Sequence, residues 1–270
     1  MTTLTSSPGA VPAPGSAVLA ALRHSLVLAG RSVLKIRRTP EQLIDVTLQP
    51  IIFLGLFVYL FGGAIAGSTH DYLQFVLPAL MVQNGLFVAT AIGVNLNSDI
   101  GKGVFDRFRS LPIARSAPLV GAVLGDVVRF TLSIGVLVAV GMVMGFDPTA
   151  GPLRTVAACL LLVGFSMCVS WIFVLVGLLA RSAGAVQGLA FLLVFPLTFG
   201  SSTFVPVDTM PDWLQSWVRV NPVTHLVDAV RGLMLGGPVG TPLWQTIAWA
   251  AGIVAVFAPL AVRAYRRKAV

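Results

Sequence analysis

Charged residues are scarce in this sequence. Asp, Glu, Lys and Arg make up only 10% of its 270 residues, whereas 56% are hydrophobic. The surface of a water-soluble domain normally needs about 25% charged residues, so this composition excludes a soluble globular protein. A lipid bilayer must therefore surround most of the chain.

The usual motifs of catalysis, metal binding and nucleotide binding are also missing. Neither HExxH nor CxxC occurs and the three histidines are scattered, so we predict no catalytic site and no metal site. The phosphate-binding pattern GxxxxGK[ST] fails because Leu96 stands at its first Gly and Gly103 follows Lys102. We expect no cofactor in this chain, and any ATP must be bound by another subunit. Cys159 and Cys168 fall on opposite faces of a helix, so we expect them to be unpaired.

Six apolar stretches are long enough to cross a bilayer, for which a helix needs roughly 20 residues. They cover residues 46–66, 72–95, 119–146, 153–180, 183–206 and 242–262. The sequence therefore predicts an all-α polytopic membrane protein with a six-span domain over residues 46–262.

Basic residues are distributed unequally between the connecting segments. With six spans both termini share one side, and fourteen of the 18 Lys and Arg residues fall there, including the basic tail of residues 263–270. Cytoplasmic segments carry this excess, so we expect a plasma-membrane protein with both termini in the cytoplasm. The net charge of +8 then reflects orientation and contact with anionic lipid, and not nucleic-acid binding, since no basic patch contains interleaved aromatic residues.

The first 45 residues precede the first span. Residues 1–16 are rich in Pro, Ser, Gly and Ala and predict a disordered tail without a signal peptide. Within residues 17–45, an apolar stripe runs beside a basic face formed by Arg23, Arg31, Lys35 and Arg38. This pattern is typical of a helix lying in the membrane interface, and we expect Pro40 to end it.

The loop of residues 97–118 predicts a short amphipathic helix. Ser98 or Asp99 can cap its start, and Pro112 ends it. Four apolar residues share one face: Ile100, Val104, Phe108 and Leu111. Such a helix can insert into a groove of another protein or rest on the lipid interface of its own protein, and the sequence leaves both interpretations open.

Residues 207–241 form the largest segment between spans on the opposite side. Trp213 and Trp217, four residues apart, indicate a surface helix at the membrane interface. The following segment, which begins at Asn221 and Pro222, is too short and too polar to cross. We predict a re-entrant or interfacial helix that ends at Gly236 and Gly237, in which Asp228 and Arg231 form a local ion pair.

Uncharged polar residues and phenylalanines lie together within the second and fifth apolar stretches. Eight of them are candidates to line a path for a bulky amphipathic solute: Gln83, Asn84, Phe87, Thr90, Phe191, Phe195, Thr198 and Phe199. The polar members can equally be hydrogen-bonded helix contacts. An ion-coupled carrier keeps charges deep in its spans, and here only Asp126 and Arg129 qualify, which we interpret as a structural pair.

Two segments resemble signatures of type-2 ABC exporter permeases. GVFDRFRSLPIAR, residues 103–115, resembles their cytoplasmic loop, and NPVTHLVDAVRGLMLGG, residues 221–237, resembles the end of the segment before their last span. The similarity is greatest to the daunorubicin-resistance branch, and it covers essentially the whole chain because the leader, spans and basic tail fit the same plan.

This resemblance implies partners and roles for particular residues. The complex would contain two ATPase subunits, which bind ATP and Mg, and a second permease chain, identical or homologous. The helix of residues 99–115 would be the coupling helix that docks on the ATPase, through Asp99, Gly103, Phe105, Asp106, Arg107, Phe108, Arg109, Leu111, Pro112 and Arg115. A second ATPase contact would involve Arg31, Lys35, Arg38 and Glu41. The solute path would follow the second and fifth spans at the permease dimer interface.

The resulting prediction is the transmembrane subunit of an ATP-driven exporter, not itself an enzyme, that moves a hydrophobic or amphipathic drug or lipid-like solute. One alternative is an exporter of lipid-linked polysaccharide or envelope lipid. Another is a membrane protein that transports nothing and only binds a partner through residues 97–118.

Overall fold

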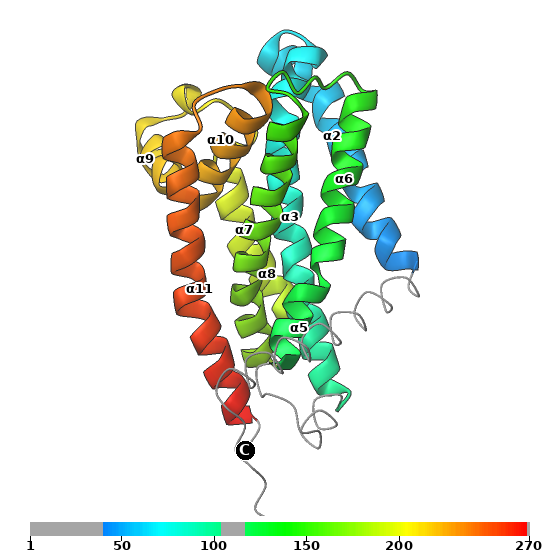
Figure 1. Ribbon diagram of the computed structural model, residues 1–270, viewed down its shortest axis with the longest axis vertical. Helices are drawn as coiled ribbons and strands as arrows, with labels where there is room; N and C mark the ends of the chain where they lie inside the picture. Colours follow the sequence, from blue (N-terminus) through cyan, green and yellow to red (C-terminus); the bar gives the residue numbers. More distant parts are fainter. Residues whose placement is uncertain (1–39, 104–116, 269–270) are drawn as a thin grey trace, which may run out of the picture.

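The computed structural model describes the backbone of residues 40–103 and 117–268, and the side chains of residues 48–103 and 119–267. The regular secondary structure of this part of the chain is entirely helical, and its long helices run side by side along the long axis of the molecule (Figure 1). Their order is α2 (Pro40–Ala66), α3 (Thr69–Gly101), α5 (Ala117–Gly125), α6 (Val127–Val143), α7 (Pro152–Leu179), α8 (Ala183–Phe199), the 3-10 turn η1 (Val207–Thr209), α9 (Asp212–Val220), α10 (Pro222–Leu235) and α11 (Gly240–Lys268).

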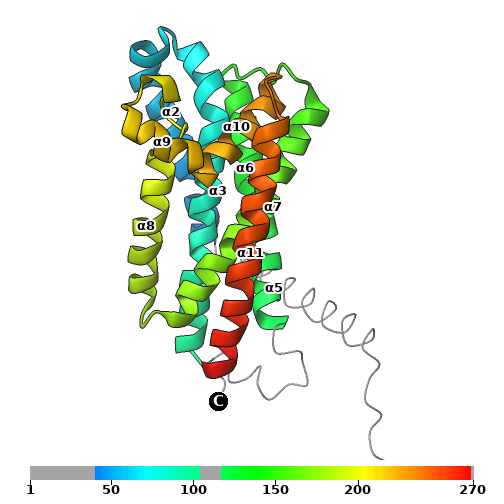
Figure 2. The ribbon, with the colours of Figure 1, turned by 90° about the vertical axis from the view of Figure 1, so that its left-hand side faces the viewer.

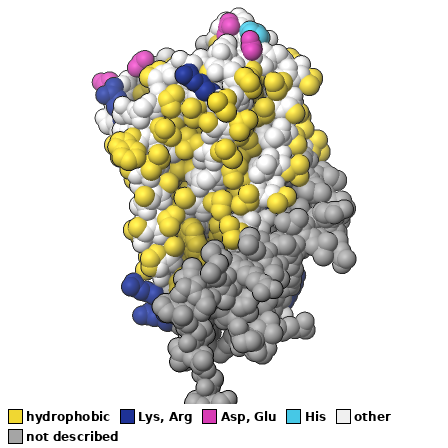
Figure 3. Space-filling view, viewed as in Figure 1, with side chains coloured by type: hydrophobic (Ala, Val, Ile, Leu, Met, Phe, Trp, Pro, Cys, Tyr) yellow, Lys and Arg dark blue, Asp and Glu magenta, His cyan; other side chains and the backbone are white. Residues whose placement is uncertain are grey.

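Within the described residues, five segments are long and apolar enough to cross a membrane. They are Leu48–Ala66, Thr69–Gly101, Leu119–Val143, Pro152–Leu179 and Gly240–Arg267, and α8 is a shorter apolar helix of 17 residues. The predicted all-helical class is confirmed for this part of the chain, but six long spans are not. Hydrophobic side chains cover the middle of the face seen in Figure 3, and charged ones lie toward its two ends.

Helix α8 ends earlier than predicted. The sequence predicted a span over residues 183–206, but the helix stops at Phe199 and residues 200–206 form turns. The N–H of Gly200 still bonds to the carbonyl of Pro196 (2.9 Å), and the side-chain amide of Asn221 donates to the carbonyls of Leu197 (2.7 Å) and Gly200 (2.7 Å). These bonds satisfy the last carbonyls of the helix, so it can end inside the protein.

The boundaries near residues 97–103 also differ from the prediction. Helix α3 continues through Ser98 and Asp99 to Gly101, where the N–H of Lys102 bonds to the carbonyl of Ser98. Gly103 has a φ of 68°, a left-handed conformation that suits glycine and stops a helix. A new helix capped at Ser98 or Asp99, and a single helix over residues 99–115, are therefore wrong.

Two other predicted boundaries need correction. Pro40 begins α2, so residues 40–45 belong to the first long helix, as suits a proline at a helix start; residues 1–39 lie outside the described part. Helix α11 continues to Lys268, so most of the predicted basic tail is the last part of that helix.

Helix α3 occupies the centre of the bundle. In the most apolar stretch of α3, 72% is buried, whereas only 11% of the corresponding stretch of α11 is buried. A Cβ atom on Gly177 of α7 would lie 2.5 Å from the carbonyl oxygen of Gly93 of α3, and one on Gly93 would lie 2.5 Å from the carbonyl of Phe173. The backbones of α3 and α7 are therefore in direct contact, as small residues allow between membrane helices.

Helices α9 and α10 lie at the end of the bundle opposite the last helical turn of α11; we call this the upper end (Figure 1). Asn221 caps α10 by accepting from the N–H of Val223, and Gly236 ends it with a φ of 85°. The predicted stop at Gly236 is confirmed. The predicted ion pair of Asp126 with Arg129 is also confirmed. It lies at the junction of α5 and α6, where Nη1 of Arg129 is 3.6 Å from Oδ1 of Asp126.

Candidate functional site: an aromatic seam, a polar cavity and an arginine cluster

A row of phenylalanine rings connects α2 to α8. On α2, Phe53, Phe57 and Phe61 follow one another at intervals of four residues, with ring centroids 6.0 and 5.4 Å apart. On α8, Phe191, Phe195 and Phe199 repeat this spacing at 5.1 and 4.3 Å. Four-residue spacing places side chains on one face of a helix, so each helix carries a column of rings.

Phe204 joins the two columns. It lies in the turn after α8, and its ring centroid is 4.7 Å from that of Phe57 and 4.8 Å from that of Phe199. The columns on α2 and α8 with Phe204 form what we call the aromatic seam. Phe204 is nearly buried, whereas the other rings, except Phe57, are between 40 and 56% exposed. The seam therefore presents a continuous aromatic surface to whatever surrounds the chain.

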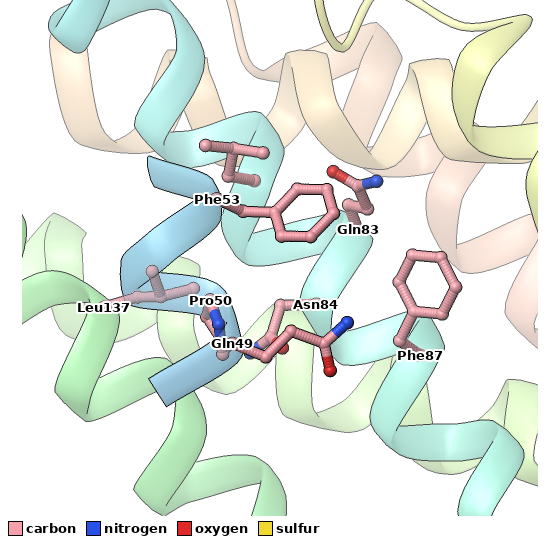
Figure 4. A pocket seen from close by; sticks show the side chains of 8 residues that line it. Gln49, Pro50, Phe53, Gln83, Asn84, Phe87 and Leu137 are labelled. Carbon is pink, nitrogen blue, oxygen red and sulfur yellow. The ribbon is translucent and has the colours of Figure 1, made fainter. Parts of the chain in front are cut away.

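A small cavity lies beside Phe53, between α2, α3 and α6 (Figure 4). We call it the polar cavity because three amide side chains, Gln49, Gln83 and Asn84, interrupt its mainly apolar lining. It has a volume of about 40 Å³, and it is lined by Gln49, Pro50, Phe53, Leu80, Gln83, Asn84, Phe87 and Leu137. Gln83 is only 4% exposed, and its Oε1 has no hydrogen-bond donor among the described residues. An unpaired buried carbonyl costs about 1–3 kcal/mol, so this position favours a molecule that carries a donor.

The structure brings three of the predicted path residues together at this cavity: Gln83, Asn84 and Phe87. The amide of Asn84 also donates to the hydroxyl of Ser133 on α6. Thr90, the next polar residue along α3, is half-buried and its hydroxyl donates to the carbonyl of Phe87 within the same helix.

On α8 the predicted path residues separate into two groups. Phe191, Phe195 and Phe199 lie on the exposed seam, whereas Thr198 is fully buried and its hydroxyl donates to the carbonyl of Val194. Thr198 therefore does not contribute to the aromatic surface.

Sequence reasoning missed Phe53, Phe57, Phe61 and Phe204. The four-residue spacing of the rings on α2, which matches that on α8, was the available signal.

A second cavity lies between α7, α8 and α11, below α9 and α10. Its volume is about 270 Å³, and its lining is apolar apart from Asn221, whose amide already donates to two carbonyls. Trp217 of α9 and Trp249 of α11 are among the lining residues. Such a cavity suits an aliphatic or aromatic group without polar atoms.

At the upper end, Arg231 of α10 is the centre of a polar cluster. Its guanidinium lies 3.4 Å from Asp228, as the sequence predicted, and also donates to the carbonyls of Phe75 on α3 (3.3 and 3.1 Å) and Ser202 (3.2 Å). It stacks over the ring of Phe75 at 4.0 Å. Burial lowers the pKa of Arg231 to about 10, with the Asp228 carboxylate opposing the shift. The side chain therefore stays charged at neutral pH.

Few of the predicted ATPase-docking residues lie in the described part of the chain. Asp99 belongs to the last turn of α3, and Gly103 follows that helix. The remaining residues of the predicted coupling helix, from Phe105 to Arg115, and the side chains from Arg31 to Glu41 lie outside it.

Comparison with known proteins identifies relatives that cover most of the chain. The model of the ABC-2 type transporter family matches residues 24–235. A daunorubicin resistance ABC transporter permease protein of Streptomyces coeruleorubidus is 44% identical over 97% of this chain and 91% of its own length. A doxorubicin resistance ABC transporter permease protein of Mycobacterium tuberculosis is 29% identical over 77% of each chain.

Proposed function

Since the chain belongs to the ABC-2 type transporter family, in which the ATPase is a separate subunit, we propose that this permease exports planar aromatic drugs across the plasma membrane. The aromatic seam is the observation that carries the proposal. Aromatic rings prefer to stack on one another at centroid distances of roughly 4.5–7 Å, and the partly exposed columns offer such faces to a solute. The names of the two relatives, which concern resistance to daunorubicin and doxorubicin, agree with this solute class.

The polar cavity would supply the second feature of recognition. The unpaired Oε1 of Gln83 lies beside Phe53, at the lower end of the column on α2. A solute that stacks on Phe53 and carries a hydroxyl or amine would satisfy this carbonyl. A purely hydrocarbon solute would leave it unpaired and would bind less tightly.

In the membrane, α8 would be the fifth span along the chain and would bring the number of spans to six. Its 17 residues rise about 25 Å, close to the shortest length that crosses a hydrocarbon core, and it runs from the lower end of the bundle to α9 and α10 (Figure 2). Arg263, Arg266 and Arg267 lie near the lower end of α11. The excess of basic residues on that side supports placing it, and both termini, in the cytoplasm, which makes the upper end the outer one.

A second permease chain, identical or homologous, would cover the aromatic seam and complete the path. Exposed apolar side chains on both columns support this arrangement, because a second column could face the first across a gap that a planar solute fills. The loop of residues 97–118 and the leader would dock on the two ATPases. Helix α3 connects that loop to the upper end without interruption over about 50 Å, so a movement of the loop would reach the path directly.

Export of a lipid is the second candidate function, and the apolar cavity between α7, α8 and α11 favours it. An acyl chain needs no polar partner, and the lining offers no charged side chain among the described residues. The two functions differ in which cavity the solute uses.

Transport by the complete complex would test the proposal. Inverted membrane vesicles that contain this chain and its ATPase should accumulate daunorubicin when ATP is supplied, and Phe195→Ala should reduce the initial rate several-fold. Phe257→Ala is a matched control, because Phe257 lines only the apolar cavity. If Phe195→Ala transported daunorubicin at the full rate and Phe257→Ala did not, the solute would use the apolar cavity and not the aromatic seam.

The docking role of residues 97–118 has its own test. Reversing the charges of Asp106 and Arg107 should weaken binding of the ATPase. We would measure the amount of ATPase recovered with the permease in a pull-down from mild detergent. Unchanged recovery would contradict the proposed docking role of this loop, but it would not bear on the proposed role of the aromatic seam.

A further inference from the structure

The turn of residues 200–206 lies between the aromatic seam and the arginine cluster. It follows α8 and carries Ser202 and Phe204, two residues apart. Phe204 closes the upper part of the seam by stacking between Phe57 and Phe199. Ser202 belongs to the cluster, since its hydroxyl donates to Asp228 (3.0 Å) and its carbonyl accepts from Arg231 (3.2 Å). A displacement of the turn would therefore move both the ring of Phe204 in the seam and the groups of Ser202 that bond within the arginine cluster.

The other side of the cluster is fixed to α3 three residues before Pro78. Pro78 has no N–H and leaves the carbonyl of Gln74 without its helical partner. The next carbonyl along α3, that of Phe75, accepts two bonds from Arg231, at 3.3 and 3.1 Å. A planar guanidinium has five donors in a fixed arrangement, so Arg231 can bond to α3, to the turn and to Asp228 at once.

Between the turn and α3 there is also a direct bond. The hydroxyl of Tyr72 donates to the carbonyl of Phe204 at 3.3 Å. That bond is long and between neutral groups, whereas the bonds through Arg231 involve a charged donor and are about twice as strong. Arg231 is therefore the main link that holds the turn against α3.

We propose that Arg231 is a positioning residue that latches the turn of residues 200–206, and with it Phe204, over the outer end of the solute path. Its bonds to the carbonyls of Phe75 and Ser202 keep the outer end closed, and they break when solute leaves. Water can replace them, because the side chain of Asp228 is 40% exposed and that of Arg231 is 19% exposed. The path itself rests on the proposed function, but the closure of the turn can be measured without transport.

Thiol labelling at Thr203 would measure opening of the turn. Thr203 is fully buried beside Ser202, so Thr203→Cys, in a chain without Cys159 and Cys168, should react with a membrane-impermeant maleimide only when the turn lifts. The assay uses membranes that contain the permease with its ATPase. Arg231→Gln should raise the labelling rate about tenfold or more, as loss of bonds to a charged group allows. Arg231→Lys, which keeps the charge but lacks the planar fork, should give an intermediate rate.

Arg219→Gln is the matched control. Arg219 lies at the same end of the bundle, but its only hydrogen bond among the described residues is to Gln215 within α9, so labelling should not change. Where Arg231→Gln does not assemble, Ser202→Ala removes one bond of the cluster and should raise labelling by a smaller factor. Equal labelling of Thr203→Cys with and without these substitutions, in assembled complexes, would overturn the latch.

The energy coupling provides a readout that a purely structural role would not change. With Arg231 present, labelling of Thr203→Cys should depend on the nucleotide bound to the ATPase; with Arg231→Gln it should be fast in every nucleotide state. If labelling responds in this way while no aromatic solute is transported, the proposed solute class fails and the latch stands. If the solute is transported while labelling ignores Arg231, the latch fails and the proposed function stands.

Discussion

Replacement of Gly177 by alanine should destabilise the bundle, because it inserts a methyl group between two backbones. The new Cβ would lie 2.5 Å from the carbonyl oxygen of Gly93 and 2.9 Å from its Cα. Ordinary contacts of a Cβ atom begin at about 3.4 Å, so α3 and α7 would have to separate by roughly 1 Å. Neither obstacle can rotate away, since both are main-chain atoms.

The expected magnitude follows from two opposing effects. Overfilling a packed site typically costs about 1–3 kcal/mol, whereas a Gly→Ala change inside a helix returns up to about 1 kcal/mol through helix propensity. We therefore expect Gly177→Ala to lower the free energy of unfolding by about 1–2 kcal/mol. Since α3 would also be displaced, solute-stimulated ATPase activity should fall as well.

Gly164→Ala supplies the control on the same helix. A Cβ at Gly164 would meet nothing within 4 Å in this chain, so only the propensity effect should remain and stability should stay equal or rise. Both variants would be unfolded in mixed micelles with an increasing fraction of denaturing detergent. If Gly177→Ala were as stable as Gly164→Ala, the direct backbone contact between α3 and α7 would be refuted.

Two further predictions concern α10. Asn221→Ala removes the oxygen that caps α10 and the amide that bonds to the carbonyls of Leu197 and Gly200; it should cost about 1–3 kcal/mol, seen as a lower unfolding temperature. Asn221→Asp keeps the capping oxygen but places a buried carboxylate against the same two carbonyls, so it should lower the unfolding temperature further. Burial lowers the pKa of His225 below 6.5 although Asp228 opposes this, so the folded state binds fewer protons than the unfolded one and stability should fall as the pH drops below 6.5. His225→Gln should remove that pH dependence, and an unchanged slope would contradict it.

The sequence predicted the class of fold because apolar length and charge asymmetry are properties of composition. It misplaced helix ends where the decisive bonds come from distant residues. The early end of α8 depends on an amide from Asn221, more than twenty residues away, and no local pattern around Phe199 reports it. Likewise Ser98 and Asp99 are good capping residues, but α3 continues through them.

Glycine spacing within one helix does not identify the closest backbone contact of this chain. The GxxxG pairs in the sequence include Gly184 and Gly188, at which a Cβ would meet nothing within 4 Å in this chain. The closest backbone approach instead joins Gly93 and Gly177, which are single glycines on different helices. A contact of this kind depends on how two helices cross, and periodicity within one helix does not encode that.

The arginine cluster shows why the sequence found only part of the candidate site. Asp228 and Arg231 are one turn apart on a helix, so their pairing follows from spacing alone. The other two acceptors of Arg231 are main-chain carbonyls, at Phe75 and Ser202, and every residue has such a carbonyl. Pro78 lies inside α3 and deprives the carbonyl of Gln74 of its helical donor, but the carbonyls that Arg231 reaches are those of Phe75 and Ser202. The proline therefore does not identify the acceptors of Arg231, because those acceptors depend on how α10 and the turn after α8 pack against α3, and no pattern within one segment encodes that packing.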